Sequence, residues 1–293
     1  MGATLGISRH YGNIDAIVHN GAVVNWNADY DKLGAPNVSS TIDLLNATAS
    51  SPIHPRFVFV SGGLKTDPDE NPAAVAKRLG GLNGYVQTKF VCEGVIQDVV
   101  KGLPKEQNRL PIVKPGRIIG SENNGVANVD DLIWRIVSGA AAIHAYPVAS
   151  ENWMYIADVG SVASMALGQV FDEDAIDSFV HVAGGMPTPV FWKLVNEELK
   201  VKCKPVSWAE WKELAHASMA AVGDKHPLWP VQHFLGALGA PRSARELATE
   251  SLEHKQWHKA VKKNVQYLME IGLIASSTGE LGNVKDCATK RLH

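Results

Sequence analysis

The sequence predicts an α/β fold, a doubly wound parallel sheet followed by a C-terminal helical lobe. Short apolar runs alternate with helical patterns over roughly the first 120 residues, which is typical of parallel strands joined by crossover helices. Beyond about residue 185, apolar residues recur mainly at helical spacing. The chain has 293 residues, 45% of them hydrophobic, and is therefore long enough for one large domain or two modest ones.

The first predicted elements are a strand and the helix that follows it. Ile14–Val18 is a short apolar run that ends in the turn residues Asn20 and Gly21, as a buried parallel strand would. Residues 37–51 form the predicted crossover helix, because apolar side chains recur there at helical spacing. These side chains belong to Val38, Ile42, Leu44 and Leu45.

Two more strands and a second helix complete the predicted sheet. Phe57–Val60 is rich in the β-branched and aromatic residues that pack well on a pleated surface. A polar loop with several prolines leads from there into a helix that carries Tyr85 and Lys89. The apolar run of residues 110–114 is the third strand, and it ends at the Pro-Gly dipeptide at 115–116.

Residues 1–185 are predicted to form the sheet domain, and residues 186–293 a helical lobe that binds substrate. Helices are predicted over residues 190–200 and 207–219, the second with Ser207 as N-cap. Four side chains of the second helix fall on one predicted face: Trp208, Trp211, Leu214 and Ala215. This face either packs in a core or forms the wall of an apolar substrate pocket.

Composition argues against several classes of function. The net charge of -2, with both signs spread along the chain, provides no basic surface for nucleic acid. No apolar run is long enough to span a bilayer and the N-terminus lacks an apolar signal core, so we expect a cytoplasmic protein. The cysteines form no C-x-x-C pair, which argues against structural zinc. His254 and His258 lie four residues apart without a third ligand, so no metal site is predicted.

The stretch NGYVQTKFVCE, residues 83–93, carries the clearest catalytic pattern. On a helix, Tyr85 and Lys89 lie one turn apart on the same side. An ammonium close to a phenol stabilises the phenolate and lowers its pKa, so that the phenol can exchange a proton near neutral pH. Tyr85 and Lys89 are therefore the predicted catalytic pair, although a solvated helix face produces the same spacing.

Together with this pair, several segments make the chain resemble the extended short-chain dehydrogenase/reductase superfamily. The segments are IDAIVHNGAVVNW, FVFVSGG, GYVQTKFVCEGVI, VKPGRIIG and NWMYIADV. More narrowly, the chain resembles the thioester reductase domains that release products from nonribosomal peptide and polyketide synthases, carboxylic acid reductases included. Members of that family bind NADPH and reduce a carrier-bound thioester to an aldehyde or alcohol. The resemblance covers nearly all of residues 1–240.

The resemblance implies roles for individual residues. Tyr85 would donate the proton and Lys89 would hold the nicotinamide ribose. The cofactor cleft, expected to be vestigial here, would be lined by His19, Gly21, Ala22 and Pro115. The family has a Ser or Thr just after the second strand, to hydrogen-bond the substrate carbonyl, where this chain has Gly62. Ser61, one residue earlier, is the predicted catalytic substitute if the turn is bulged.

Other departures weaken the expected grip on NADPH. The family begins with a strand, a glycine-rich loop and a helix that hold the pyrophosphate, and we find no equivalent loop in this sequence. We therefore expect an incomplete Rossmann-like sheet and no productive cofactor. The family's Arg-Pro-Gly after the third strand is Lys114-Pro115-Gly116 here, and the glycine of its Asn-Val-x-Gly-Thr motif is Ser40.

These departures favour a non-redox enzyme of fungal secondary metabolism as the first hypothesis. A cleft without its dinucleotide could orient an acyl or polyene chain for cyclisation of the Diels-Alder or Dieckmann type. The alternative is NADPH-dependent reduction of a carrier-bound thioester or aldehyde, the chain being a fragment of a full reductase. A second alternative is an inactive scaffold that binds a synthase or carrier protein.

The same reasoning indicates the partners. The expected substrate is a hydrophobic small molecule or acyl chain, and an acyl or peptidyl carrier protein is a candidate partner. Without the family's first strand, Ile14–Val18 would have an unpaired edge, and such edges promote aggregation. We expect the N-terminal segment, a helix or a second copy in a homodimer to cover this edge.

Overall fold

The computed structural model describes residues 14–62, 71–104, 110–148, 153–171, 179–181, 185–235 and 257–274. The chain falls into two compact units. Unit 1 comprises residues 1–116 and 162–182, and unit 2 comprises residues 117–161 and 183–293. The predicted division at residue 185 assigned residues 117–161 to the first domain, whereas the structure assigns this segment to unit 2.

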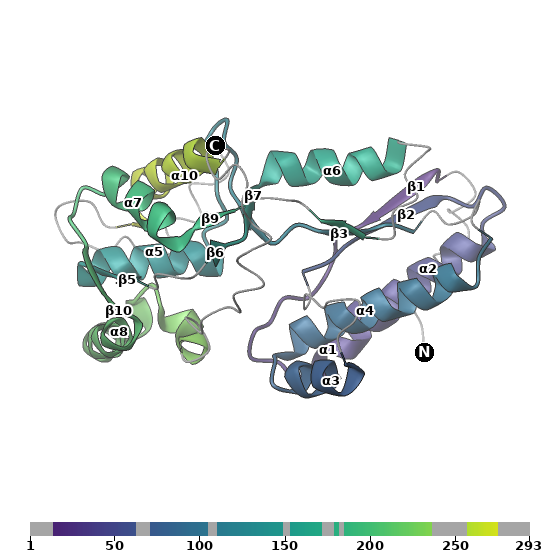
Figure 1. The fold of residues 1–293 in the computed structure, drawn as a ribbon, viewed down its shortest axis with the longest axis horizontal. Helices are drawn as coiled ribbons and strands as arrows, with labels where there is room; N and C mark the ends of the chain where they lie inside the picture. Colours follow the sequence, from purple (N-terminus) through teal and green to yellow (C-terminus); the bar gives the residue numbers. More distant parts are fainter. Residues whose placement is uncertain are drawn as a thin grey trace. The chain divides into compact units, whose positions relative to one another are not determined.

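Unit 1 is built around a parallel sheet with the strand order β1-β2-β3-β8 (Figure 1). Its strands are β1 (Ala16–His19), β2 (Arg56–Val60), β3 (Ile112–Lys114) and β8 (Phe179–His181). The first three are the predicted strands, which are therefore confirmed. The fourth, β8, joins them from a part of the chain where the sequence analysis placed no strand.

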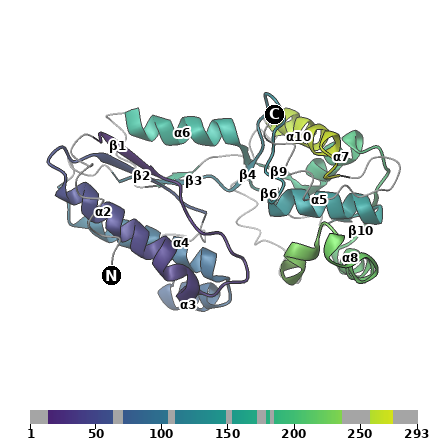
Figure 2. The ribbon, with the colours of Figure 1, turned by 180° about the vertical axis from the view of Figure 1, so that it is seen from behind.

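Helices cover both faces of this sheet (Figures 1 and 2). One face carries α2 and α4, which are the two predicted helices, and the other face carries α6. The helices of unit 1 are α1 (Tyr30–Leu33), α2 (Ser40–Ser50), α3 (Pro72–Gly80), α4 (Gly84–Lys101) and, from Val162 onward, α6 (Val159–Phe171). A π-helical segment, Gly34–Ser39, joins α1 to α2, so the helix predicted over residues 37–51 starts with wider turns.

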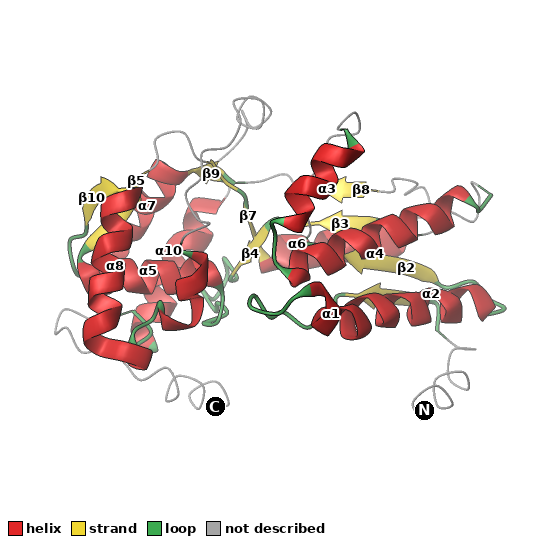
Figure 3. Ribbon diagram, turned by 90° about the horizontal axis from the view of Figure 1, so that it is seen from below, coloured by secondary structure: helices red, strands yellow, loops and turns green. Residues whose placement is uncertain are grey.

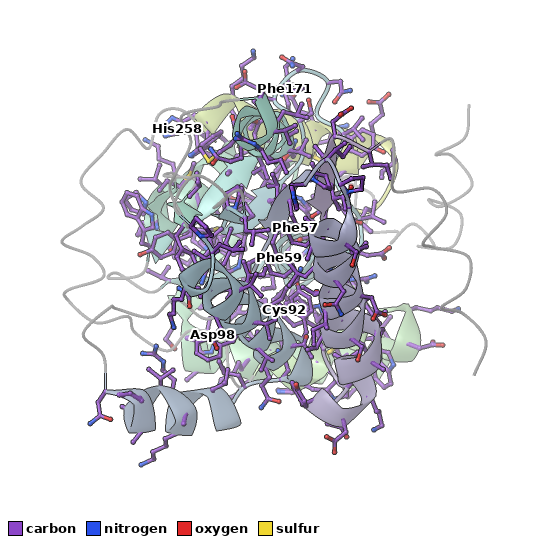
Figure 4. The ribbon with its side chains drawn as sticks, turned by 90° about the vertical axis from the view of Figure 1, so that its right-hand side faces the viewer. Phe57, Phe59, Cys92, Asp98, Phe171 and His258 are labelled. Atoms are coloured by element: carbon purple, nitrogen blue, oxygen red, sulfur yellow. The ribbon has the colours of Figure 1, made fainter. Side chains whose placement is uncertain are left out.

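The core of unit 1 lies between the sheet and α4. Phe57 and Phe59 of β2 share one buried cluster with Cys92 and Ile96 of α4. Figure 4 shows Phe57, Phe59 and Cys92 in the interior, between the strands and the helices. Every residue of β2 is buried, as expected for a central parallel strand. This packing fixes which face of α4 turns toward the sheet.

The strand β1 lies at one edge of the sheet that the structure describes. Its partner is β2, with Ala16 opposite Arg56 and His19 opposite Phe59. Within the described residues no strand pairs with the other edge of β1, and Val18 is 43% exposed. Residues 1–13 lie outside the description, so the covering of this edge stays a prediction.

Three two-stranded sheets lie in the described part of unit 2 (Figure 3). They pair β4 (Arg117–Ile119) with β7 (Ile156–Asp158), β5 (Ala145–Val148) with β10 (Lys204–Ser207), and β6 (Trp153–Met154) with β9 (Met186–Pro187). The break between β3 and β4 falls at Gly116, whose φ of 73° is a left-handed conformation that glycine adopts readily. The chain therefore leaves the sheet of unit 1 at the predicted dipeptide and enters unit 2 earlier than predicted.

The helices of unit 2 include both of those predicted for the C-terminal lobe. They are α5 (Leu132–Ile143), α7 (Thr188–Glu198), α8 (Trp208–Val222) and α10 (His258–Glu270), with 3₁₀ turns over Gly223–Lys225 and Trp229–Phe234. None of the helices in the described ranges is long and apolar enough to cross a membrane.

The helix α8 begins and packs largely as predicted. The Ser207 side chain accepts a hydrogen bond from the Glu210 amide at 3.2 Å, which confirms the predicted N-cap. Trp211 and Ala215 are fully buried, and the Trp211 indole nitrogen donates to the Ala145 carbonyl at 2.9 Å. Leu214, predicted on the same face, is 40% exposed. Core packing therefore accounts for Trp211.

We predict that Gly84→Ala destabilises unit 1. A Cβ at Gly84 would overlap the backbone of Asp29 and lie 2.6 Å from the Tyr30 amide nitrogen. The Gly84 amide also donates to the Ala28 carbonyl at 3.1 Å, so this approach docks the start of α4 on the loop after β1. Relieving the overlap should cost about 1–3 kcal/mol of the free energy of unfolding, measured by urea denaturation.

Gly94→Ala is the matched control on the same helix. Nothing lies within 4 Å of a Cβ at Gly94, so alanine should stabilise the helix by up to about 1 kcal/mol. Equal effects of the two substitutions on the unfolding midpoint would contradict this account of Gly84.

Candidate active site

The predicted site residues lie at the carboxyl ends of adjacent parallel strands. β1 ends at His19, β2 at Val60 and β3 at Lys114. The register pairs His19 with Phe59, and Val60 with Val113, so the three ends lie side by side. In open α/β sheets this edge is where ligands bind.

Tyr85 is the second residue of α4 and is oriented by its neighbours. The Asn83 side chain caps the helix by accepting from the Val86 amide at 3.0 Å. The Trp26 ring contacts the Tyr85 ring edge-on, with centroids 5.5 Å apart. On the side of β2, a Cβ added to Gly62 would lie 3.3 Å from the Tyr85 hydroxyl. The position where the family has a Ser or Thr thus faces the Tyr85 hydroxyl.

Lys89 lies one turn further along α4 and is 3% exposed. Its ammonium donates to the Val60 carbonyl at 2.8 Å and lies 4.5 Å from the centre of the Phe59 ring. Burial lowers the pKa of Lys89 to about 8, and Cys92 and Glu93 oppose this shift. Near neutral pH the side chain therefore keeps its charge by a small margin.

The proton of Tyr85 is held more firmly than the sequence analysis predicted. Burial raises the pKa of the Tyr85 phenol. The expected net lowering of the Tyr85 pKa was therefore wrong, because the phenol is largely withdrawn from water and this burial raises its pKa. At neutral pH Tyr85 is a phenol, which is the form that a proton donor needs.

Ser61 belongs to a buried network that the sequence analysis did not find. Its hydroxyl donates to Oε1 of Glu93, and Oε2 of Glu93 accepts from the Lys114 ammonium at 2.8 Å. Ser61, Lys114 and Glu93 are all nearly or fully buried, so this is an interior ion pair. A catalytic role for Ser61 stays a prediction, and in the structure its hydroxyl is engaged with Glu93.

His19 has a defined partner on α2. The Thr41 hydroxyl donates to the Asn37 carbonyl at 2.7 Å, so it accepts from Nε2 of His19 at 2.9 Å. Burial and the charge of Lys89 lower the pKa of His19, which keeps the imidazole neutral. The structure thus brings His19, Lys89 and Tyr85 together in unit 1.

The segment after β1 is held by Asn37. Its amide oxygen accepts from the Val23 amide at 2.7 Å, and its amide nitrogen donates to the Val23 carbonyl at 3.1 Å and to the Thr88 hydroxyl at 3.1 Å. This links the stretch that contains Gly21 and Ala22 to α4. Pro115, directly after β3, is buried. The cofactor-binding role of these three residues stays a prediction.

Spacing could have pointed to Glu93, whereas Asn37 stands only as the first residue of the family's Asn-Val-x-Gly-Thr motif, which does not indicate its contacts. Tyr85, Lys89 and Glu93 follow one another at intervals of four, which places them on one side of a helix. Asn37 reaches Thr88 across 51 positions of the chain, and such a contact has no periodicity.

The structure offers no metal centre within the described ranges. No group of three or more His, Cys, Asp or Glu side chains there could hold an ion. His258 begins α10, and His254 lies outside the description. Cys92 and Cys203 are buried free thiols.

Comparison with known proteins identifies the family. A family model described as "Male sterility protein", an NAD-binding domain, matches residues 6–166. The N-benzoylphenylalaninol synthetase of Penicillium brevicompactum is 37% identical over 94% of this chain and 12% of its own length. The reductase domain of PhqB from Penicillium fellutanum is 31% identical, and the match covers 89% of this chain and 70% of that one, with a TM-score of 0.73.

The fold extends to more distant relatives. The terminal R domain of the myxalamid PKS-NRPS pathway has a TM-score of 0.73 at 20% identity, covering 92% of this chain and 72% of that one. The chain therefore spans about one eighth of the curated synthetase and most of a solved reductase domain. It belongs to the reductase-domain family of nonribosomal peptide and polyketide synthases, within the extended short-chain dehydrogenases/reductases.

Proposed function

We propose that this chain works in the reduction of an acyl or peptidyl thioester, or of the derived aldehyde, with NADPH as cofactor. The observation that carries the proposal is the arrangement of Tyr85, Lys89 and Gly62 at the carboxyl edge of the sheet. The protonated phenol of Tyr85 lies beside Gly62, which has no side chain, and the buried ammonium of Lys89 lies one helical turn away. This is an arrangement suited to protonating a carbonyl oxygen that gains electrons.

We prefer reduction to the cyclisation hypothesis. The cyclisation hypothesis depended on two features of the sequence. One is the lack of a recognisable glycine-rich loop, and the other is Gly62 at the position where the family has a Ser or Thr. The relatives support reduction, because the solved PhqB reductase domain is 31% identical to this chain and covers 89% of it.

The described residues fit the nicotinamide end of NADPH. Lys114 forms an ion pair with Glu93 at 2.8 Å, and the Lys89 ammonium lies at the carboxyl end of β2, where a cation would attract an anionic cofactor. At Gly21, an added Cβ would meet nothing closer than the His19 ring at 3.9 Å, so a ligand can approach this backbone. Lys89 would hold the ribose, and His19, Gly21 and Pro115 would lie beside the ring. When bound, NADPH supplies the hydride.

The side chains of the chain itself would control the proton. Tyr85 would donate a hydrogen bond to the substrate carbonyl and then its proton to the oxyanion, leaving a phenolate. The Lys89 ammonium would stabilise that phenolate, because opposite charges one helical turn apart attract strongly in a buried site. Trp26 would keep the Tyr85 ring in place.

The expected substrate and carrier partner follow from this proposal. Relatives that are synthetases support a substrate delivered on an acyl or peptidyl carrier protein, with a hydrophobic chain attached. A homodimer and a cytoplasmic location stay predictions.

Reduction is tested with NADPH and the N-acetylcysteamine thioester of octanoic acid. We expect NADPH absorbance to fall in step with the formation of octanal or octanol. Tyr85→Phe should lower kcat by about 10²–10⁴-fold and leave NADPH affinity, measured by calorimetry, unchanged. Tyr30→Phe, a partly buried tyrosine of the same unit, is the control. Formation of a cyclic product from a polyene thioester without NADPH consumption would support cyclisation instead.

We also predict an alkaline loss of activity. The pKa of Lys89 is lowered from 10.5 to about 8, so the ammonium predominates only below about pH 8. If the charged form is required, kcat/KM should fall as the pH rises through this value. A profile that stays flat well above pH 8 would contradict the role assigned to Lys89.

Gly62→Ser should place a hydroxyl beside Tyr85, where the family has one. Its Cβ would be tight against the Tyr85 hydroxyl, so the ring must shift by a few tenths of an ångström. Gly62→Ala imposes the same crowding without a donor. We expect the serine variant to exceed the alanine variant in kcat by about tenfold or more, because a donor aimed at the oxyanion is gained. Equal rates would show that a hydroxyl at position 62 does not reach the substrate.

A further inference from the structure

We propose that Glu93 is a positioning residue of this site: its carboxylate, held by Ser61 and Lys114, fixes the location and the charge of the Lys89 ammonium. The proposal deepens the proposed function and rests on it for its catalytic consequence. Its structural part concerns residues of unit 1 alone, and it can be measured without substrate or cofactor.

The geometry ties two consecutive residues of the chain to two consecutive turns of one helix. The Val60 carbonyl accepts from Lys89 at 2.8 Å, and the hydroxyl of the next residue, Ser61, donates to Glu93. Lys89 and Glu93 lie four apart on α4, so both bonds run from the same helix face to the end of β2. Gly62, the residue that faces Tyr85, follows directly. Glu93 therefore helps to hold the backbone that Lys89 binds and that Tyr85 faces.

The third contact comes from the neighbouring strand. Lys114, the last residue of β3, donates to the second carboxylate oxygen of Glu93 at 2.8 Å. The Lys114 and Glu93 side chains are only 11% and 6% exposed, so water screens their charges poorly. Both oxygens of Glu93 thus have donors, and its orientation is set by two strands at once.

The charges around Lys89 make Glu93 the carboxylate that offsets it. From its own helix, Cys92 and Glu93 oppose the effect of burial on the Lys89 pKa. From β1, His19 faces Lys89 as a neutral ring. From β3, Lys114 adds a second positive charge on the far side of Glu93. The nearby side chains of the π-helical segment and α2, Asn37 and Thr41, are uncharged.

The test is a titration of Lys89 in the protein without ligands. The protein is labelled with [6-¹³C]lysine, and the Lys89 signal is assigned by its loss in Lys89→Arg. Wild-type Lys89 should titrate near pH 8. Glu93→Gln removes the negative charge and should lower this midpoint by about one pH unit or more. Glu93→Asp, which keeps the charge, should restore most of the shift.

Two further variants keep the test valid even if Glu93→Gln fails to fold. Lys114→Gln removes the competing cation and should move the Lys89 midpoint in the opposite direction, upward. Asp98→Asn removes a carboxylate from the same helix, at a side chain that is 76% exposed and paired with Lys101, and should leave the midpoint unchanged. Figure 4 labels Asp98 and Cys92 on this helix.

The outcomes separate the two proposals. A Lys89 midpoint that is the same in wild type, Glu93→Gln and Lys114→Gln overturns the positioning role, whatever the enzyme does. A shifted midpoint without NADPH-dependent reduction by the wild type supports the positioning role and overturns the proposed function. If both the positioning role and the proposed function hold, the alkaline limb of kcat/KM in Glu93→Gln should move to lower pH by the same amount as the Lys89 midpoint. A purely structural defect would instead lower the rate equally at all pH values.

Discussion

The docking of one face of α4 on the carboxyl end of β2 is the constraint on which the candidate site depends. Lys89 reaches the carbonyl of Val60, and Glu93 reaches the hydroxyl of Ser61. Both contacts lie next to the apolar cluster of β2 and α4, which brings the helix close enough for them to form. Tyr85, one turn before Lys89 on the same face, is thereby placed against Gly62.

The buried charges of Lys89 and Glu93 restrict α4 to one position on the sheet, because each charge needs its own partners. An ammonium that lies over an aromatic ring loses most of its hydration, so Lys89 depends on a carbonyl oxygen and a nearby carboxylate to remain charged. The Glu93 carboxylate in turn depends on Ser61 and Lys114. Removing one partner of such an interior pair typically costs about 3–5 kcal/mol, because the other charge is left buried and unpaired. A shifted helix would incur the same penalty.

This architecture explains why the site suits proton donation. Burial raises the pKa of the Tyr85 phenol and lowers that of the Lys89 ammonium. In the proposed reduction the two groups would have different roles: the phenol would donate a proton, and the ammonium would stabilise the phenolate that remains. The helical character of unit 2 was expected of a substrate lobe, but its Trp211 is used for packing and for a hydrogen bond to Ala145.

The sequence by itself determined the local features: the strands β1, β2 and β3, the helices α2, α4, α7 and α8, the Ser207 cap, and the helical pair Tyr85 and Lys89. Each of these depends on neighbours within a few positions, so its pattern can be read from the order of residues. Tertiary structure alone decided the rest. It joins β8 to the sheet and brings the chain into unit 2 at Arg117. It also sets the partners of Ser61 and raises the pKa of Tyr85. Those features arise from burial and from contacts between distant parts of the chain, such as the one that Asn37 makes with Thr88, and no periodicity in a sequence records them.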